Sequence, residues 1–460
     1  MATLTTGDLR RFSREKQLEF GRGLRDGTPR RRLAELSGEQ RRDPIAELAA
    51  QNKSRIPSLV PVRRERMSES PFAFYRGAAA VMAADLAGTA TTGVLIQICG
   101  DAHLSNFGLF ASRERALLFD VNDFDETAVG PWEWDVKRLV TSMAILGHDF
   151  GMSDDDVRQT ATKTAAAYRT RINELAQMSA LERFYLKTTA LEVLDLVSRL
   201  SKSASKLATE TVSKASRNTS HRALRKLTTT TVDGHYRIVE QQDIAVRVPE
   251  MGLSEAAAMV DEYFGSVPED VVALLACHQF QDAVVRVVGV GSVGTRCYLA
   301  LLTDADGSPL FLQMKEASVS VVEEYFPQEL RWEHGRRVVA GQRIMQASGD
   351  PFLGYVTSSR RGSFYVRQFR DMKGSVDITS LTDPDDLALY GSLCALALAR
   401  AHAQSGVPGV IAGYLGGGTD PNAADTAFAD FAEAYSRLNR EDHQRLLVAT
   451  DEEWLPILMS

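Results

Sequence analysis

Two stretches in the first third of the chain decide its fold: GVLIQICGDAHLSNFGLF at residues 93–110 and RALLFDVNDFDE at residues 115–126. Each joins an apolar run typical of a buried strand to a cluster of small polar residues. Loops held on rigid strands are favoured positions for chemistry. The sequence therefore predicts two strands whose following loops, around Asp101 and Asp123, form a functional site.

Carboxylate and amide side chains gather in these two loops. They are Asp101, Asn106, Asp120, Asn122, Asp123, Asp125 and Glu126. Magnesium prefers oxygen ligands and is usually held by one or two carboxylates together with substrate phosphates. We therefore expect Asn106 and Asp123 to hold magnesium, with Asp120 as the runner-up. Asp101 is then free to orient or deprotonate an attacking hydroxyl, as phosphoryl transfer requires. Capping of turns is the alternative explanation for any one of these residues.

A glycine-rich segment, GVGSVG at residues 289–294, lies in the last third of the chain. Its G-x-G-x-x-G spacing alone is weak evidence, because it occurs in dinucleotide-binding turns and in ordinary hairpins. A dinucleotide fold needs a helix directly after the glycines, whereas TRCYLALLTDADGSPLFLQMK indicates a strand, an Asp-Gly turn and a second strand that ends at a lysine. This is the order of a kinase nucleotide lobe. The residues predicted to contact nucleotide phosphates are Gly289, Gly291, Ser292, Gly294 and Lys315.

In a kinase lobe a carboxylate on the next helix holds the strand lysine. We expect this partner of Lys315 to be Glu333. The competing carboxylates are Glu323, Glu324 and Glu329. The strand FYVRQF at residues 364–369 is then the last strand of the lobe, and Gln368 opens the hinge expected to hydrogen-bond adenine. The alternative for Lys315 is an exposed lysine at the end of a strand.

Two motifs carry a resemblance to a known superfamily. GDAHLSN at residues 100–106 resembles the GDxHxxN catalytic loop of aminoglycoside and choline phosphotransferases, which are protein-kinase-like enzymes. DFDETAVGPWEWD at residues 123–135 is similar to their metal-binding segment, although Trp132 departs from the family's usual small residue.

The resemblance implies a role for each matching residue. Asp101 would be the catalytic aspartate and His103 would shape its loop. Asn106 and Asp123 would bind magnesium, and Asp135 would brace the loop from the following helix. The implied cofactors are ATP and Mg²⁺.

A closer resemblance covers most of the chain. SPFAFYRGAA, CGDAHLSNFG, FDVNDFDE, GPWEWDVKRL, GVGSVGTR, LQMKEA and GQRIMQ are similar to the bacterial family called domain of unknown function 2252. This resemblance does not imply any particular substrate.

These observations predict an α+β, kinase-like fold with two lobes. Residues 1–280 would hold the N-terminal helices, the catalytic and metal loops and a helical lobe. Residues 281–372 would form a small antiparallel β-rich lobe, and residues 373–460 would complete the larger helical lobe. Because the catalytic loops precede the glycine-rich lobe, the reverse of the kinase order, the fold is expected to be circularly permuted. Either the helix over residues 73–86 or the one ending LALARAHA precedes the catalytic loop in space.

The composition is that of an ordinary globular protein. The formal net charge of -7 disfavours a dedicated nucleic-acid binder. The N-terminus has no apolar stretch behind its charges and the four cysteines are scattered, which predicts a cytoplasmic protein outside the membrane. Arginines upstream of the catalytic loop, such as Arg76, are interpreted as solvated, with phosphate contact as the alternative.

The predicted function is magnesium- and ATP-dependent phosphoryl transfer to a hydroxyl of a small molecule or protein. AMP transfer with a reversed nucleotide, a nucleotide-binding regulator without catalysis and a metal-dependent phosphohydrolase are the alternatives. Neither the acceptor nor the oligomeric state follows from the sequence.

Overall fold

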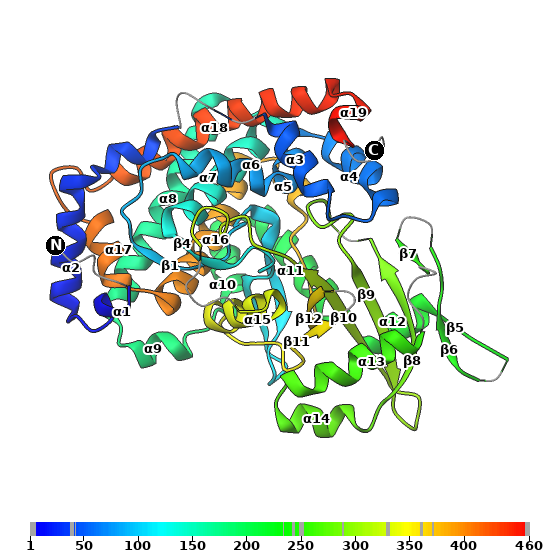
Figure 1. The fold of residues 1–460 in the computed structure, drawn as a ribbon. Coiled ribbons are helices and arrows are strands. Elements are labelled where there is room, and N and C mark those ends of the chain that lie inside the picture. The colour runs from blue at the N-terminus through cyan, green and yellow to red at the C-terminus, as the bar shows by residue number, and fades with distance from the viewer. Residues whose placement is uncertain are drawn as a thin grey trace.

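The computed structural model describes residues 6–36, 41, 43–232, 234–241, 244–247, 253–287, 289–327, 332–358, 362–369 and 372–455. Within these residues the chain forms a larger helical part and a smaller part built on an antiparallel sheet (Figure 1). The mixed α+β class predicted from the sequence is confirmed.

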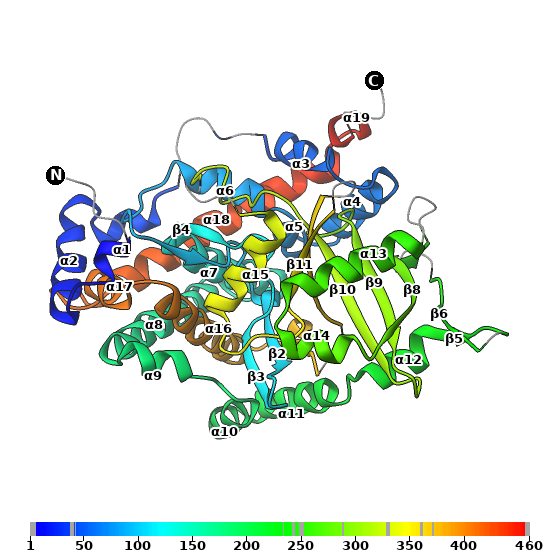
Figure 2. The ribbon, with the colours of Figure 1, turned by 60° about the horizontal axis from the view of Figure 1, so that its bottom comes forward.

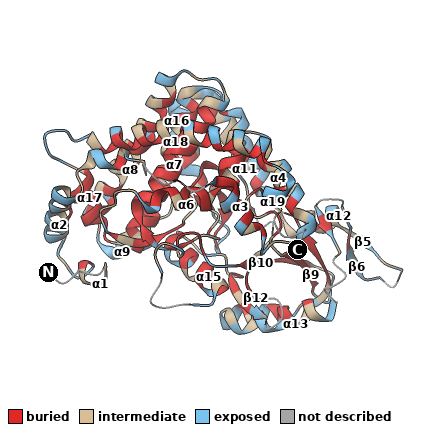
Figure 3. Cartoon of the chain, turned by 45° about the horizontal axis from the view of Figure 1, so that its top comes forward, coloured by how far each residue is buried: buried red, intermediate tan, exposed pale blue. Residues whose placement is uncertain are grey.

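The helical part is packed around α7, which is buried along nearly all of its length (Figure 3). Its charged residues near the N-terminus are buried together with its apolar ones, and α8, α16 and α18 pack against α7 and cover it. The helices of this part are α1 (Thr6–Leu9), α2 (Arg14–Gly27), α3 (Pro44–Asn52), α4 (Val60–Ser68), α5 (Pro71–Gly77), α6 (Ala79–Ala87), α7 (Trp132–Asp149), α8 (Asp154–Gln177), α9 (Ala180–Tyr185), α10 (Ala190–Leu200), α11 (Lys202–Ser216), α16 (Pro384–Ser405), α17 (Pro408–Leu415), α18 (Ala423–Val448) and α19 (Asp451–Trp454).

Two antiparallel strand pairs lie inside the helical part and carry the polar loops. β1 (Leu95–Ile98) pairs with β4 (Ala128–Pro131), and β2 (Phe107–Ala111) pairs with β3 (Leu117–Val121). The loop after β1 leads into β2, and the loop after β3 leads into β4. The two pairings therefore hold the two polar loops next to each other.

The second part is a sheet with the strand order β11-β12-β10-β9-β8-β7, in which all described neighbours are antiparallel. Its strands are β7 (Ala245–Val246), β8 (Gln279–Arg286), β9 (Cys297–Thr303), β10 (Pro309–Ala317), β11 (Gly354–Ser358) and β12 (Gly362–Gln368). Alternate residues of β10 enter different cores, with Leu310 and Leu312 on one face and Phe311 on the other. Lys315 lies opposite Cys297 of β9 and Tyr365 of β12.

Both faces of the sheet are covered by helices (Figure 2). The helices are α12 (Ser220–Leu227), α13 (Leu253–Tyr263), α14 (Glu269–Leu275) and α15 (His334–Met345), and a ribbon of β5 (Thr228–Thr230) and β6 (Tyr236–Ile238) adjoins α12. α13 and α14 share one core with the sheet, and α12 shares the other. The described residues between 220 and 275 thus lie with the sheet, whereas the sequence suggested that they belong to the helical lobe.

Helix α15 lies between the two parts. It packs on β11 and β12 of the sheet and also on β1 and α16 of the helical part (Figure 2). A further difference concerns the single helix expected over residues 73–86, which is divided at Ala78 into α5 and α6. No helix among the described residues combines the length and the apolar character needed to cross a membrane.

Candidate active site

The turn after β1 has a backbone that only glycine suits. Gly100 has a φ of 78°, and a Cβ on it would lie 2.2 Å from the carbonyl oxygen of Glu126. This close approach brings the loop after β1 against the loop after β3. Asp101 is the next residue in the chain after Gly100.

Asp135, at the start of α7, holds this turn from behind. Its carboxylate accepts hydrogen bonds from the N–H groups of Cys99, at 2.8 Å, and Gly100, at 2.9 Å. Nε2 of His402, from the distant helix α16, lies 3.0 Å from the same carboxylate. The structure therefore places Asp135 where the resemblance expected a brace, and it adds a histidine that the sequence analysis did not anticipate.

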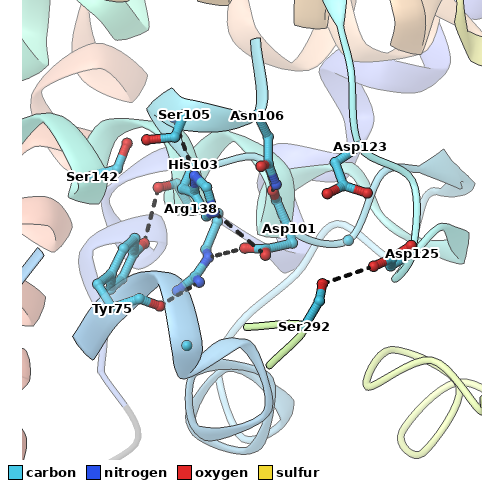
Figure 4. Close-up of polar contacts among 12 residues, drawn as sticks. Tyr75, Asp101, His103, Ser105, Asn106, Asp123, Asp125, Arg138, Ser142 and Ser292 are labelled. Carbon is cyan, nitrogen blue, oxygen red and sulfur yellow. Dashed lines mark hydrogen bonds and ion pairs between the residues drawn. The ribbon is translucent and has the colours of Figure 1, made fainter. Parts of the chain in front are cut away.

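The Asp101 carboxylate is held by an arginine from the next turn of α7. Arg138 donates from Nε to Oδ1 of Asp101 at 2.7 Å and from Nη2 to the carbonyl oxygen of Tyr75 at 2.7 Å (Figure 4). Its guanidinium also lies over the Tyr75 ring, 3.7 Å from the ring centroid. Fixed donors on one oxygen restrict the orientation of this carboxylate. A spacing of three residues from Asp135 puts Arg138 on the same helix face, which is the signal that the sequence analysis missed.

His103 completes the surroundings of Asp101. Its Nδ1 accepts a hydrogen bond from the N–H of Ser105 at 3.2 Å, and its Nε2 lies 3.7 Å from Oδ2 of Asp101. Burial lowers the pKa of His103 to about 4, so the imidazole is neutral near pH 7. Nδ1 is the acceptor, so the proton is on Nε2 and faces Asp101.

Asn106 and Asp123 lie on adjacent loops in the same site. The side chain of Asn106 donates to the carbonyl oxygen of Asp101 at 2.7 Å, and its backbone oxygen accepts from the N–H of Asn122 at 2.8 Å. Oδ1 of Asp123 is buried without a hydrogen-bond partner in the described structure. A buried carboxylate oxygen left without a partner is suited to a ligand.

Cations surround the Asp123 carboxylate. Burial alone would raise the pKa of Asp123, but Lys315, Arg367 and Lys373 outweigh burial and lower the pKa to about 2. Nζ of Lys315 lies 4.0 Å from Oδ2 of Asp123. Asp123 is therefore ionised at physiological pH.

Lys315 points from the sheet toward the helical part. Its ammonium contacts the Asp125 carboxylate, which also accepts from the Tyr365 hydroxyl at 2.7 Å. Burial opposes the charged form, but Asp123 and Asp125 raise the pKa of Lys315 well above its usual value. The side chain is 4% exposed, so the alternative of an exposed strand-end lysine is wrong.

The expected partner of Lys315 is corrected by this geometry. Glu333 is an exposed residue at the start of α15, and the acidic partners of Lys315 are Asp125 and Asp123 instead. Of the competitors, Glu323 pairs with Arg337 at 3.2 Å, and Glu329 lies outside the described residues. Glu324 lines the cavity described below. The carboxylate partner of Lys315 comes from the loop after β3 and not from α15. The charged side chain that α15 directs toward this loop is an arginine, Arg337, which donates to the Asp125 backbone oxygen at 2.9 Å.

Two further predicted residues lie elsewhere. Asp120 is buried on β3, where it accepts from Arg400 at 3.0 Å and from the Ala347 N–H at 2.8 Å, so its position does not suit the runner-up metal role. The N–H of Gln368 donates to Oδ2 of Asp350 at 2.7 Å and is thereby occupied, which does not suit hydrogen bonding to adenine. The rest of the predicted hinge includes residues 370 and 371, which lie outside the described residues.

The glycine-rich loop joins β8 to β9, and the N-terminal segment packs against it. The Ile56 N–H donates to the Gly294 carbonyl oxygen at 2.8 Å, and Arg66 donates to the Gly289 carbonyl oxygen at 2.7 Å. A Cβ on Gly291 would lie 3.0 Å from the carbonyl oxygen of Arg76. The Ser292 hydroxyl lies 3.4 Å from Oδ2 of Asp125 (Figure 4). The loop is therefore held between the N-terminal helices and the metal loop.

A cavity of about 550 Å³ lies where these segments meet. The loops after β1 and β3 contribute Asp101, His103, Asn106 and Asp123, and the glycine-rich loop contributes Gly289, Gly291 and Ser292. Its carboxylates are Glu47, Asp101, Asp123, Asp125, Glu126, Glu316 and Glu324, and its cations are Arg55 and Arg76. The two motifs that the sequence analysis singled out thus face one cavity.

The cavity has oxygen ligands but no ready-made metal cluster. No three histidine, cysteine, aspartate or glutamate side chains in the described part of the chain converge as a metal site. Magnesium does not require such a cluster, because it commonly binds one or two protein oxygens and completes its shell with phosphates and water. Asp123 and Asn106 supply ligands of that kind.

Comparison with known proteins places the chain in a family. A family model described as "Uncharacterized protein conserved in bacteria (DUF2252)" matches residues 55–449, and the chain belongs to this family. The matched range includes the catalytic loop, the metal loop, the glycine-rich loop and Lys315. No curated protein and no solved structure matches the chain.

Proposed function

We propose that the protein is a magnesium- and ATP-dependent phosphotransferase with a circularly permuted, kinase-like fold, acting on a hydroxyl of a small molecule or a protein. The observation that carries the proposal is the shared cavity, in which Asp101, Asn106 and Asp123 face the glycine-rich loop. Its volume of about 550 Å³ lies in the range of sites for small molecules and cofactors.

The order of elements in the sheet part supports a nucleotide lobe. β8, the glycine-rich loop, β9 and β10 with Lys315 follow one another as glycine loop and lysine strand do in kinases. A helix, α15, comes next and packs between the lobes. The pairing of Lys315 with Asp125 rather than with a carboxylate of this helix departs from the kinase pattern.

The contact between α16 and β1 supports the permutation. Near the end of α16, the Ser405 hydroxyl donates to the carbonyl oxygen of Gln97 in β1 at 2.8 Å. Earlier in α16, Tyr390 donates to the carbonyl oxygen of Leu104 at 3.1 Å. These contacts support α16 as the helix that precedes the catalytic strand in space, although Tyr390 follows Leu104 by 286 positions in the chain.

The residues present fit a magnesium ion. Asp123 offers an ionised carboxylate with a buried, unpartnered oxygen, and Asn106 lines the same cavity. When bound there, magnesium neutralises charge on the phosphates of the nucleotide. Lys315 and the backbone N–H groups of the glycine-rich loop would bind the other phosphate oxygens.

Asp101 would act on the acceptor. The acceptor oxygen forms a bond to the γ-phosphorus while the bond between that phosphorus and the leaving ADP oxygen breaks, with its electrons going to ADP. The proton of the acceptor hydroxyl passes to Asp101. Arg138 keeps one carboxylate oxygen occupied, so Oδ2 is the oxygen that receives the proton.

The proposal is tested with ATP labelled on the γ-phosphorus. Wild-type protein is incubated with magnesium, labelled ATP and panels of protein and small-molecule acceptors, beside Asp101→Asn. We expect transfer by the wild type and its loss in the variant. Equal transfer by both proteins, or tight ATP binding without turnover on any acceptor, would reject the proposal.

AMP transfer is the second candidate function, and the positive charge near Asp123 favours it. A second, small cavity of about 40 Å³ is lined by apolar side chains and by polar ones that include Arg367, Lys373 and Asp350. Arg367 donates to Gln313 at 2.9 Å, and burial together with Arg367 lowers the pKa of Lys373 to about 7. Cations at the inner end of the site suit a phosphate tail better than an adenine ring.

A nucleotide bound with its phosphates inward would bring the α-phosphorus to Asp101. The acceptor oxygen would then bond to that phosphorus, the bond to pyrophosphate would break, and pyrophosphate would leave. ATP labelled on the α-phosphorus distinguishes the two reactions, because label from that position enters the product only in AMP transfer.

A further inference from the structure

One arginine in the cavity has no partner among the described residues. Arg76, in the last turn of α5, lines the cavity together with Asp101 and Ser292. Its Nε is buried without a hydrogen-bond partner, and its side chain forms no ion pair in the described part of the chain. Leaving a partly buried guanidinium without a partner costs free energy, so its presence in the cavity favours a ligand there.

The backbone of Arg76 lies directly beneath the glycine-rich loop. A Cβ on Gly291 would be 3.0 Å from the Arg76 carbonyl oxygen. Of the carboxylates that act on the guanidinium, Asp101 acts most strongly and is followed by Glu69 and Asp123, while burial lowers the pKa of Arg76. The backbone of Arg76 therefore lies against the glycine-rich loop, while its side chain shares the cavity with Asp101.

Arg76 is not needed to neutralise Asp101. Arg138 already does so, through the 2.7 Å contact from its Nε to Oδ1 of Asp101. The Arg138 guanidinium also donates to the backbone oxygen of Tyr75, the residue before Arg76. One arginine thus fixes both the aspartate and the segment that carries the other arginine.

The helix that presents Arg76 is anchored at several points. The Phe72 N–H donates to Asp149 at 3.1 Å, and the Asn439 side chain donates to the Pro71 carbonyl oxygen at 2.9 Å. The Tyr75 hydroxyl donates to the backbone oxygen of Arg138 at 2.9 Å. These contacts fix the backbone from which the Arg76 side chain extends, which limits the reorganisation needed when charge develops beside it.

We propose that Arg76 is a catalytic residue that binds the phosphoryl group during its transfer and stabilises the negative charge on its oxygens. This inference rests on the proposed phosphotransferase function. In phosphoryl transfer the charge spreads over three equatorial oxygens, and an arginine supplied from within the chain or by a partner stabilises it. Arg76 is supplied from the N-terminal segment, outside both polar motifs that define the site.

The test compares binding of a transition-state mimic with binding of a ground-state analogue. Titration calorimetry measures the affinity of magnesium-ADP with aluminium fluoride, and separately that of magnesium with a non-hydrolysable ATP analogue. Arg76→Ala is expected to weaken binding of the fluoride complex about 100-fold or more, as loss of one preorganised donor does, and to leave the analogue affinity within about tenfold. Arg76→Lys is expected to lie between, because lysine keeps the charge but loses the planar fork.

Controls separate this inference from the proposed function. Arg199→Ala removes an exposed arginine, 71% exposed and paired only within α10, and is expected to bind both complexes as the wild type does. An unchanged melting temperature is expected for Arg76→Ala, because its side chain has no described partner to lose. If the wild type binds the fluoride complex tightly and Arg76→Ala binds it equally well, the inference about Arg76 fails while the proposed function stands. The same holds if Arg76→Ala weakens binding of the fluoride complex and of the ATP analogue by the same factor. If the wild type binds neither complex, the proposed function fails with it.

Discussion

The ammonium of Lys315 contacts the carboxylate of Asp125, two residues that are 190 positions apart in the chain. The same ammonium lies 4.0 Å from Oδ2 of Asp123. This pair joins β10 of the sheet part to the loop after β3. In the proposed function the lysine would meet the nucleotide phosphates beside the bound metal. Binding of a nucleotide would then exchange a carboxylate partner of Lys315 for phosphate oxygens.

Asp101→Asn should remove transfer activity while leaving nucleotide binding intact. The amide keeps the size of the side chain but cannot accept the acceptor proton, and loss of a general base typically costs about 100- to 10,000-fold in rate. The measurement is the turnover number with γ-labelled ATP, alongside the ATP affinity. Unchanged turnover would remove Asp101 from the reaction.

Lys315→Met should weaken ATP binding. A hydrogen bond to a charged group contributes about 1.5–3 kcal/mol, so the dissociation constant should rise about tenfold or more. Methionine preserves the apolar stem of the side chain within the sheet. Titration calorimetry of the variant and of Arg199→Ala, which lies far from β10 in the chain, provides the comparison. Equal affinities would contradict a phosphate-binding role for Lys315.

Arg138→Met should destabilise the fold and slow transfer. It leaves the Asp101 carboxylate without its 2.7 Å partner, and breaking a buried ion pair from one side costs about 3–5 kcal/mol. Because the Asp101 side chain is 18% exposed, water compensates part of this loss. We therefore expect the free energy of unfolding, measured with urea, to fall by about 3 kcal/mol or less.

A double variant tests the coupling between these two residues. Adding Asp101→Asn to Arg138→Met should recover part of the lost stability, because the unpaired charge is then absent. Strictly additive losses would show that Arg138 acts through packing on Tyr75 and not through the carboxylate.

Stability should depend on pH through Glu126. Burial raises the pKa of Glu126 from 4.5 to about 7, so the folded protein binds this proton more tightly than the unfolded chain. The resulting stabilisation is complete below about pH 4.5 and is lost as the pH rises through about 7. Glu126→Gln keeps an acceptor for the Val321 N–H, which lies 2.8 Å from the carboxylate.

The variant should therefore lose less stability than the wild type between pH 5 and pH 8. The measurement is the free energy of unfolding of both proteins at several pH values in this interval. When the free energy of unfolding is plotted against pH, the slopes for the wild type and the variant should differ by at most about 1.4 kcal/mol per pH unit, the value for one proton. Parallel profiles for the two proteins would show that Glu126 is ionised in the folded state.

Much of the sheet part could be predicted from local sequence. Apolar runs and the Asp-Gly turn between them predicted β9 and β10, and the glycine spacing predicted the loop before them. These signals are local because strand periodicity and turn chemistry act over a few residues. A helix after β10 was expected, but Glu333 at its start was wrongly expected to pair with Lys315. Which side of a helix faces a given lysine depends on how the helix packs, and the local sequence does not show this.

The partners in the site could not be predicted, because they come from distant segments. Asp125 was recognised as part of an acidic cluster, yet its pairing with Lys315 spans 190 positions. The contact of His402 with Asp135 spans 267 positions and depends on the packing of α16 on α7. Arg76 was interpreted as a solvated arginine, because nothing in its neighbourhood indicates that the glycine-rich loop covers it.

The most direct test of the account is the affinity for ATP with and without magnesium, measured by titration calorimetry on the wild type and on Asp123→Asn. We predict that the wild type binds ATP tightly only when magnesium is present, and that Asp123→Asn loses this dependence. ATP affinity that is the same with and without magnesium, or the same magnesium dependence in both proteins, would contradict a magnesium-nucleotide site between the metal loop and the glycine-rich loop.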